Sequence, residues 1–316
     1  MGGDHLSEVF DLVEVRGLLS GGFAVRGPWV SRRAIEAPLK FFAMVSGRAR
    51  LTTDGVDEPI ELEPGDVAIL NNRSWLRVEG GTGDGPRREI TPEANFPFSG
   101  LIGADRDADD ILIGGCIDLS AAGGTLLLQA LPPLGHVRAS AASAINLRGT
   151  LHRLFEEVVG GRAGSAFAIR QYCQLLLLEV LRAYVDQAEL PPGWLRLLID
   201  ERLRPALSLM HAEPGRAWRL EELAHVAAMS RTSFAERFRT VAGVPPLTYL
   251  NRWRMLLAQR ALRGSDVRVG ELAVELGYAS ESAFSTAFKR EVGESPLRYR
   301  YRMRDELPAR TGSVPV

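Results

Sequence analysis

The 316-residue sequence contains only two cysteines, Cys116 and Cys173, and they lie far apart in the chain. This spacing does not fit a disulfide framework, so we expect a reducing, cytoplasmic location. Apolar runs are also short, because none approaches the ~20 residues that a membrane-spanning helix needs. Residues 1–5 lack a basic region followed by an apolar core, so we expect no secretory signal and no membrane partner.

Motifs of catalysis are missing as well. The sequence has no glycine-rich phosphate loop, no nucleophile elbow and no constellation of paired carboxylates. We therefore expect no catalytic residues and no cofactor. With 46% hydrophobic and 24% charged residues the composition is that of a globular protein. At roughly 100–200 residues per domain, the length predicts about two domains.

Charge is unevenly distributed, although the formal net charge is only −1. Residues 1–200 hold 19 Lys and Arg against 26 Asp and Glu, whereas residues 201–304 hold 18 against 11. A basic final third on an acidic body indicates a nucleic-acid partner for that third. A solvated basic surface is the alternative that charge alone leaves open.

The first 115 residues carry the pattern of short β-strands. Asp54-Gly55 is a hairpin turn signal, because glycine adopts a positive φ without strain. Short strands with regular turns predict an antiparallel sandwich or barrel. The apolar or alternating runs cover residues 39–45, 49–53, 67–70, 75–78, 87–91 and 111–113.

From about residue 144 the hydrophobic period becomes helical. One amphipathic helix ends at the glycine pair 160–161, and a second, more strongly apolar helix follows. Leu175 and Leu178 lie off the apolar stripe of this second helix, so it is apolar over more than one face. Such a helix is either buried or an oligomer interface, and we favour a homodimer contact over core packing. Residues 191–193 (Pro-Pro-Gly) mark the expected domain boundary.

The final third of the sequence repeats itself. Residues 219–224 (RLEELA) match residues 268–273 (RVGELA), and further matches follow along the chain. Each copy has the outline of a helix-turn-helix, with a short helix, a tight turn, a serine N-cap and two phenylalanines four residues apart. With the aromatic rings turned inward, the other face of each second helix is free for a DNA groove. The cap and anchor residues are Ser230, Phe234 and Phe238 in one copy and Ser280, Phe284 and Phe288 in the other.

A linker helix over residues 246–263 is predicted between the two copies. Pro246 suits its first turn, and Gly264 suits its C-terminal cap. At 1.5 Å per residue the helix would be about 27 Å long. A rod of this length suits two recognition helices about one DNA turn apart, near 34 Å. This spacing favours a reader of double-stranded DNA over the alternative, a helical bundle with an old duplication.

Residues 198–304 resemble the DNA-binding domain of AraC/XylS-type transcription regulators. The resemblance rests on residues 229–231 (MSR), 249–255 (YLNRWRM), 277–278 (GY), 280–284 (SESAF), 287–290 (AFKR) and 295–296 (SP). It implies that both recognition helices enter successive major grooves of promoter or operator DNA. It also implies a regulator of transcription, with RNA polymerase as a further partner if the protein is an activator.

The resemblance assigns DNA contacts to the outer faces of both recognition helices. The base-facing positions are Thr232, Ala235, Glu236, Glu281, Ser282, Ser285 and Thr286, and the phosphate-facing positions are Arg231, Arg239, Lys289 and Arg290. Alanine can make only an apolar contact with a base, whereas glutamate would accept a hydrogen bond from cytosine N4. Arg252 and Arg254 of the linker helix are further candidates, with a solvated helix face as the alternative.

Residues 1–190 resemble the cupin-type sensor domain of one branch of this family, through residues 45–48 (VSGR), 62–67 (LEPGDV) and 131–134 (LPPL). The resemblance implies an α+β protein. Residues 1–143 would form an antiparallel, cupin-like sensor barrel, and residues 144–190 a helical dimerisation segment. An all-α domain with two helix-turn-helix units, residues 198–304, would follow. Residues 305–316 are expected to form a disordered tail.

Metal-using cupins carry histidine and carboxylate ligands on neighbouring strands. None of the five histidines lies on a predicted strand, so we expect no metal site. The candidate effector-binding residues are Phe42, Met44, Trp75 and Cys116, with core packing as the alternative for each. The histidines are His5, His136, His152, His211 and His225.

The leading hypothesis is a sequence-specific, DNA-binding transcription regulator modulated by a small effector or by dimerisation. Two alternatives stay open. One is a metal-independent cupin-type enzyme with a helical appendage, and the other is an effector-independent structural DNA binder.

Overall fold

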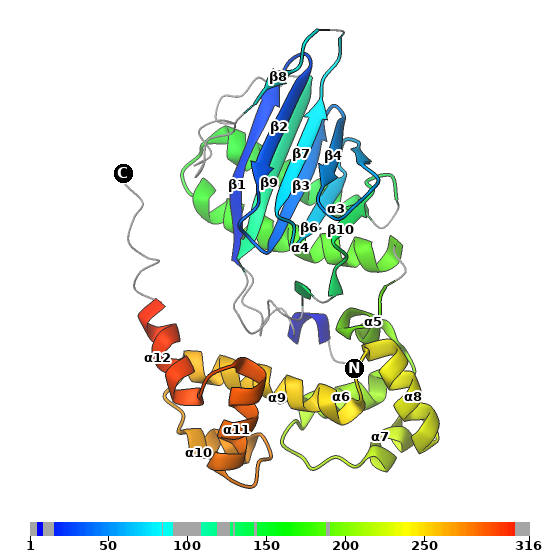
Figure 1. Cartoon of the computed structure of the whole chain (residues 1–316), viewed down its shortest axis with the longest axis vertical. Helices are drawn as coiled ribbons and strands as arrows, with labels where there is room; N and C mark the ends of the chain where they lie inside the picture. Colours follow the sequence, from blue (N-terminus) through cyan, green and yellow to red (C-terminus); the bar gives the residue numbers. More distant parts are fainter. Residues whose placement is uncertain are drawn as a thin grey trace. The chain divides into compact units, whose positions relative to one another are not determined.

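The computed structural model describes residues 5–8, 16–83, 85–90, 109–118, 127–128, 130–141, 144–187 and 190–306. The chain forms two compact units (Figure 1). The barrel unit comprises Val15–Ser120 and Leu127–Glu189, and the helical unit comprises Met1–Glu14, Ala121–Leu126 and Leu190–Val316. Most of the tail predicted at residues 305–316 lies outside the described residues.

Two five-stranded sheets make up the barrel unit. One has the order β1-β9-β3-β6-β10 and the other the order β5-β4-β7-β2-β8. The strands are β1 (Arg16–Val25), β2 (Trp29–Ala34), β3 (Leu39–Ser46), β4 (Ala49–Thr53), β5 (Ile60–Leu62), β6 (Val67–Asn71), β7 (Trp75–Gly80), β8 (Arg88–Glu89), β9 (Asp110–Asp118) and β10 (Leu134–Val137). The pairs are antiparallel except the short pairing of β2 with β8. The predicted antiparallel, cupin-like architecture is confirmed.

The turn between β3 and β4 requires a glycine. Gly47 has a φ of 80°, and a Cβ there would lie 1.9 Å from a carboxylate oxygen of Asp110. This buried carboxylate accepts the backbone N–H of Arg48 at 3.0 Å and the indole N–H of Trp29 at 2.6 Å. Trp29 is fully buried in the core between the sheets. One acidic side chain therefore ties β9 to the turn and to β2.

The expectation that no histidine lies on a strand is wrong for His136. It belongs to β10, which pairs with β6, and its Nε2 lies 2.8 Å from Oδ2 of Asp66. Asp66 also accepts the backbone N–H groups of Ala139 and Glu63, at 2.7 and 3.1 Å. The sequence did not reveal this strand because only four residues pair, and they include a glycine and a histidine.

Helices α3 (Ile145–Gly160) and α4 (Ser165–Gln187) pack against each other and against the first sheet (Figure 1). Most of the predicted stripe of α4 is buried, although Tyr172 is only half-buried, and the helix contacts β1 and β10. Outside the stripe, Leu175 is 46% exposed and Phe167 is 63% exposed. The apolar side chains of α4 therefore serve both core packing and an open face. No helix in the described part of the chain is long and apolar enough to cross a membrane.

The helical unit holds both predicted helix-turn-helix pairs. Its helices are α5 (Trp194–Ile199), α6 (Arg204–Ala212), α7 (Leu220–Val226), α8 (Arg231–Ala242), α9 (Pro246–Gly264), α10 (Val269–Glu275), α11 (Glu281–Val292) and α12 (Pro296–Glu306). The linker helix α9 contacts α6 and α8 of one half and α11 and α12 of the other (Figure 1). Gly264 is the last helical residue rather than the cap, because the N–H of Ser265 bonds to the carbonyl of Ala261.

The two copies of the repeat are built alike. The hydroxyl oxygens of Ser230 and Ser280 accept the backbone N–H three residues ahead, at 3.2 and 3.1 Å. Gly243 and Gly293 end the recognition helices in the left-handed conformation. The predicted phenylalanines are all fully buried. The two rings of each pair contact each other, and the second ring contacts a tyrosine of the next helix: Phe238 contacts Tyr249 in one copy, and Phe288 contacts Tyr299 in the other.

Candidate nucleic-acid interface and barrel cavity

The recognition helices α8 and α11 present matching faces to solvent. Over their first ten residues the order of exposed, half-buried and buried side chains is the same in both helices. The buried positions are the phenylalanine anchors. Of the predicted contact residues, Arg231, Thr232, Glu236, Arg239, Glu281, Ser282, Thr286, Lys289 and Arg290 are exposed, and Ala235 and Ser285 are half-buried. The fold therefore places all eleven on two equivalent helix faces.

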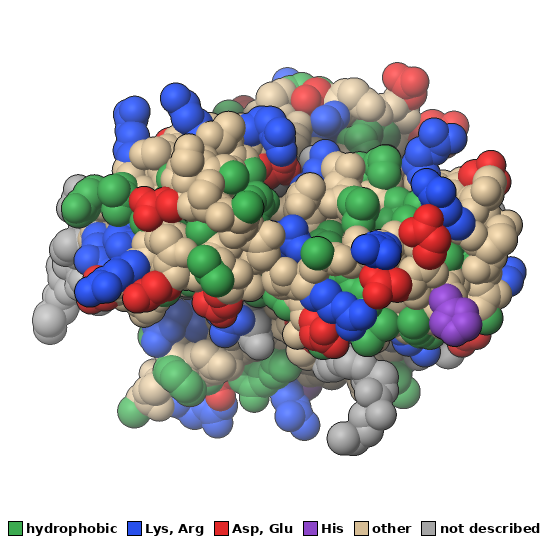
Figure 2. All heavy atoms as spheres, turned by 90° about the horizontal axis from the view of Figure 1, so that it is seen from below, with side chains coloured by type: hydrophobic (Ala, Val, Ile, Leu, Met, Phe, Trp, Pro, Cys, Tyr) green, Lys and Arg blue, Asp and Glu red, His purple; other side chains and the backbone are tan. Residues whose placement is uncertain are grey.

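The exposed charges of the helical unit are mixed in sign. Figure 2 shows Lys and Arg side chains interleaved with Asp and Glu across the face seen from below. One such pair of opposite charges joins α8 to α7, where Nε of Arg231 lies 3.2 Å from a carboxylate oxygen of Glu221. In α11, Thr286 donates its hydroxyl to the carbonyl of Ser282 at 2.9 Å. Arg239 in the last turn of α8, and Lys289 and Arg290 in the last turn of α11, are exposed cations suited to phosphate oxygens.

The two linker arginines have different surroundings. Arg254 is 9% exposed and donates to the backbone carbonyls of Pro214 and Arg216, at 2.6 and 2.9 Å. Burial lowers the pKa of its guanidinium. Arg254 therefore holds the loop after α6 in place and is not free to reach DNA. Arg252 is half-exposed, with Nε 3.5 Å from a carboxylate oxygen of Glu291 on α11.

Long-range contacts that the sequence did not reveal hold the recognition helix α8 and helix α6 in place. Arg237 of α8 donates to both carboxylate oxygens of Asp200, at 3.3 and 2.7 Å. His211 of α6 stacks on Trp253 with ring centroids 3.7 Å apart, and its Nε2 lies 2.9 Å from the hydroxyl of Tyr249. Burial lowers the pKa of His211 to about 4, so the ring is neutral at pH 7. The partners lie 37 to 42 residues apart, and no local pattern predicts them.

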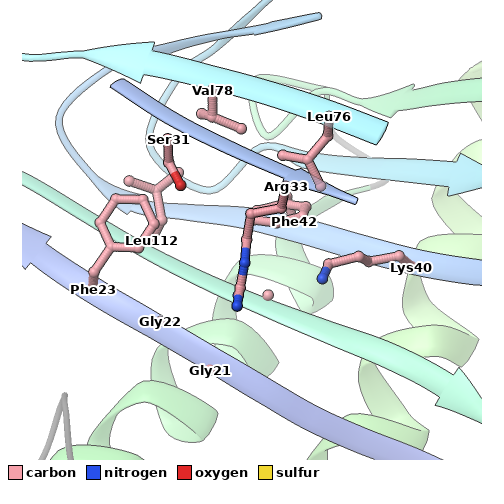
Figure 3. A pocket seen from close by; sticks show the side chains of 11 residues that line it. Gly21, Gly22, Phe23, Ser31, Arg33, Lys40, Phe42, Leu76, Val78 and Leu112 are labelled. Carbon is pink, nitrogen blue, oxygen red and sulfur yellow. The ribbon is translucent and has the colours of Figure 1, made fainter. Parts of the chain in front are cut away.

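A narrow cavity opens between the two sheets of the barrel unit (Figure 3). Its empty volume is about 400 Å³, including the open mouth. Apolar side chains and glycines line most of it, together with Ser31, Arg33 and Lys40. Figure 3 shows the charged ends of Arg33 and Lys40 directed into the same part of the cavity.

Lys40 is an unusual wall residue, because it is only 7% exposed. Its Nζ lies 5.3 Å from the centroid of the Phe42 ring. Burial lowers the pKa of the Lys40 ammonium, and the charge of Arg33 acts in the same direction, although Cys116 acts against it. The charged form of this lysine would be favoured by an anion in the cavity.

The predicted effector residues are brought together only in part. Phe42 lines the cavity. Met44 is fully buried in the core, and Trp75 is 43% exposed at the start of β7. Cys116 lies on β9 opposite Lys40 and is not among the residues that line the cavity. Arg33 and Lys40 were not among the effector-binding residues predicted from the sequence. The signal that could have identified Lys40 is its position as a lysine within the apolar run at residues 39–45.

Comparisons with known proteins cover both units. The family model described as Cupin matches residues 4–186, and the model described as Helix-turn-helix domain matches residues 223–302. An AraC-like transcription regulator of Streptomyces lividans is 35% identical over 300 residues, 94% of this chain and 98% of that protein. The chain belongs to the AraC family of transcription regulators. The predicted family is confirmed, and with it the predicted role of a DNA-binding transcription regulator.

A second AraC-like regulator, from Streptomyces antibioticus, is 35% identical over 304 residues, with 94% of this chain and 98% of that protein covered. Among solved structures, the DNA-binding domain of AdpA, a global transcriptional factor, in complex with a target DNA is similar to part of this chain. The two sequences are 36% identical, the match covers 34% of this AraC-family chain and 98% of the AdpA chain, and the TM-score is 0.33.

Proposed function

We propose that this AraC-family regulator reads specific DNA sequences with α8 and α11 together. The observation that carries this proposal is the matching exposure pattern over the first ten residues of the two recognition helices, each anchored by two buried phenylalanines. The polar middle of each exposed face is suited to base edges, and the cationic last turns are suited to phosphates. Thr232, Ala235, Glu236, Glu281, Ser282, Ser285 and Thr286 are the proposed base-facing residues.

The phosphate contacts are tested by the salt dependence of DNA affinity. We expect Lys289→Ala and Arg290→Ala each to weaken binding evenly across DNA sequences and to lower the salt slope by about one unit. The control is Arg298→Ala, an exposed arginine of α12, which should leave the slope unchanged. Fluorescence anisotropy with one duplex at several salt concentrations measures the slope. An unchanged slope in both variants would remove these residues from the interface.

We further propose that the barrel cavity binds a small anionic effector with an apolar body. Arg33 and Lys40 would hold the anionic group, while Phe23, Phe42 and Leu112 would enclose the apolar part. Because the cavity is narrow, a ligand must move some of these side chains as it enters. An effector of this kind regulates DNA binding only if it binds one state of the protein better than another.

The effector proposal is tested by replacing Lys40. Lys289, the only other lysine of the chain, provides the matched control. A panel of carboxylates with increasing apolar length serves as the probe, and the shift of the melting temperature reports binding. We expect Lys40→Met to abolish the shift and Lys289→Met to leave it unchanged. If no carboxylate shifts the wild-type protein, or if Lys40→Met responds equally, the effector proposal fails and an effector-independent DNA binder is favoured.

The remaining expectations concern assembly and chemistry. We propose a homodimer through the open face of α4, where Phe167 and Leu175 are exposed. The double variant Phe167→Glu, Leu175→Glu would then sediment as a monomer at concentrations where the wild type is dimeric.

We also propose a regulatory role without catalysis, which is supported by the names of the similar proteins. Contact with RNA polymerase would follow if the regulator activates transcription.

A further inference from the structure

Two histidines and a glutamate converge within the helical unit. His5 and Glu8 lie on a helical turn at residues 5–8, and His211 lies in the last turn of α6. Oε2 of Glu8 is 3.0 Å from Nδ1 of His5 and 2.7 Å from Nδ1 of His211. The three ligand atoms all lie within 4.8 Å of one another. Glu8 and His211 are 203 positions apart in sequence, so only the fold brings them together.

The outward nitrogens of both rings are held by further residues. Nε2 of His5 lies 2.9 Å from the hydroxyl of Ser208, and Nε2 of His211 lies 2.9 Å from the hydroxyl of Tyr249. Stacking on Trp253 fixes the plane of the His211 ring. Both rings are thereby oriented with Nδ1 towards the carboxylate of Glu8. His5 and His211 are buried, whereas the side chain of Glu8 is 41% exposed, which leaves one side open to solvent.

Two imidazole nitrogens and one carboxylate oxygen are the ligand set that zinc and related divalent transition metals prefer, and a fourth position is commonly taken by water. Metal-bound histidines typically donate their other N–H to an oriented oxygen, as Ser208 and Tyr249 provide here. In a tetrahedral site with bonds of 2.0–2.2 Å the ligand atoms lie roughly 3.3 Å apart. The contacts of 3.0 and 2.7 Å would open by only a few tenths of an ångström.

We propose that His5, Glu8 and His211 bind a divalent transition-metal ion of the zinc class. Without the ion, the Glu8 carboxylate can accept an N–H from each Nδ1. On binding, each neutral ring changes tautomer: Nδ1 releases its proton to water and coordinates the ion, while Nε2 takes up a proton from water and its N–H donates to the hydroxyl oxygen of Ser208 or Tyr249, so the ring gains or loses no net proton. The ion fastens the helical turn at 5–8 to α6, and the chain leads from this turn into β1. This site is independent of the proposed DNA contacts.

The test uses the full-length, tag-free protein stripped of metal. Calorimetric titration with Zn²⁺ at pH 7 should show one ion per chain, and Co²⁺ should give the strong visible absorption of a tetrahedral site. We expect His5→Ala and Glu8→Gln each to weaken Zn²⁺ binding by at least about 100-fold, because each removes a ligand. Ser208→Ala should weaken it by about 10-fold, because it removes only an orienting oxygen.

The matched control is His225→Ala, which removes an exposed histidine of α7 and should bind Zn²⁺ like the wild type. Circular dichroism and DNA affinity of each variant report whether the fold is kept, and these readouts separate loss of the metal site from loss of DNA binding. The proposal is overturned if the wild type takes up no Zn²⁺. It is equally overturned if folded His5→Ala and Glu8→Gln bind Zn²⁺ as tightly as the wild type.

Discussion

At the scale of the residue, burial of the phenylalanine anchors stabilises each helix-turn-helix unit. Phe284 is fully buried among Phe288, Tyr299 and apolar side chains of α9 and α10. We expect Phe284→Ala to reduce the free energy of unfolding by about 3–5 kcal/mol. Val274→Ala, at an exposed side chain of α10, should change it by less than about 0.5 kcal/mol. Equal melting temperatures for the two variants would contradict the packing described for α11.

A second residue-scale prediction concerns Asp66. Burial raises the pKa of its carboxyl, but the hydrogen bonds from His136 and from the N–H groups of Ala139 and Glu63 outweigh burial and lower it. A carboxyl with a lowered folded-state pKa stabilises the fold above its unfolded pKa of about 3.9, and this contribution is lost as the pH falls through the folded value.

Asp66→Asn should therefore cost about 1–3 kcal/mol at pH 7 and show a flatter dependence on pH below about pH 4. Urea unfolding at pH 7, 5 and 3 measures both effects. If the free energy of unfolding varied with pH in the same way for the variant and the wild type, Asp66 would not be the group that makes stability depend on pH.

Which single residues could be predicted from the sequence depends on the range of their contacts. The phenylalanine anchors and serine caps follow from local spacing, and the structure confirms them. Lys40 could not be assigned to a cavity, because the neighbours of a strand residue are set by the sheets that pack around it. Arg254 was predicted as a candidate for DNA contact because the sequence pattern does not reveal its carbonyl partners, which lie 38 and 40 residues away.

At the scale of the element, the repeat made the helix-turn-helix pairs and the linker helix predictable. Two glycine turns of the second copy, one after α10 and one at the end of α11, differ in how closely other backbone approaches them. Gly277 has a φ of 78°, and a Cβ there would lie 2.1 Å from the carbonyl oxygen of Gly215. Gly293 has a φ of 89°, but a Cβ there would meet nothing within 4 Å.

Both glycine substitutions carry the strain of left-handed backbone, about 1–2 kcal/mol. Gly277→Ala must also displace backbone atoms, so we expect it to cost more than Gly293→Ala by at least about 1 kcal/mol. Thermal unfolding of the two variants measures the difference. If Gly293→Ala proved the more damaging, the close approach of the turn at Gly277 to the loop after α6 would be contradicted.

Some elements escaped prediction for reasons of size. Strand β10 has four residues and helix α5 has six, which is too short for a hydrophobic period to show. The end of α9 was misplaced by one residue because Ser265 supplies the capping geometry that Gly264 was expected to supply. The long helices α3, α4 and α9 were foreseen because their apolar positions recur over three or more turns.

At the scale of the whole molecule, two recognition helices are joined by one rigid helix. With 19 residues, α9 is about 28 Å long at 1.5 Å per residue. It contacts both halves of the helical unit (Figure 1). Two readers joined in this way should recognise a DNA site with two parts, which one helix-turn-helix alone would not.

The most direct test is selection from random duplex DNA by the purified full-length protein, followed by sequencing of the enriched pool. We expect a motif with two conserved parts about one helical turn apart, near 34 Å. We also expect substitutions at Thr232 and Glu236 to alter one part, and those at Glu281 and Ser282 to alter the other. Enrichment of a single part, unchanged by substitutions in one of the two helices, would contradict the claim that α8 and α11 read DNA together.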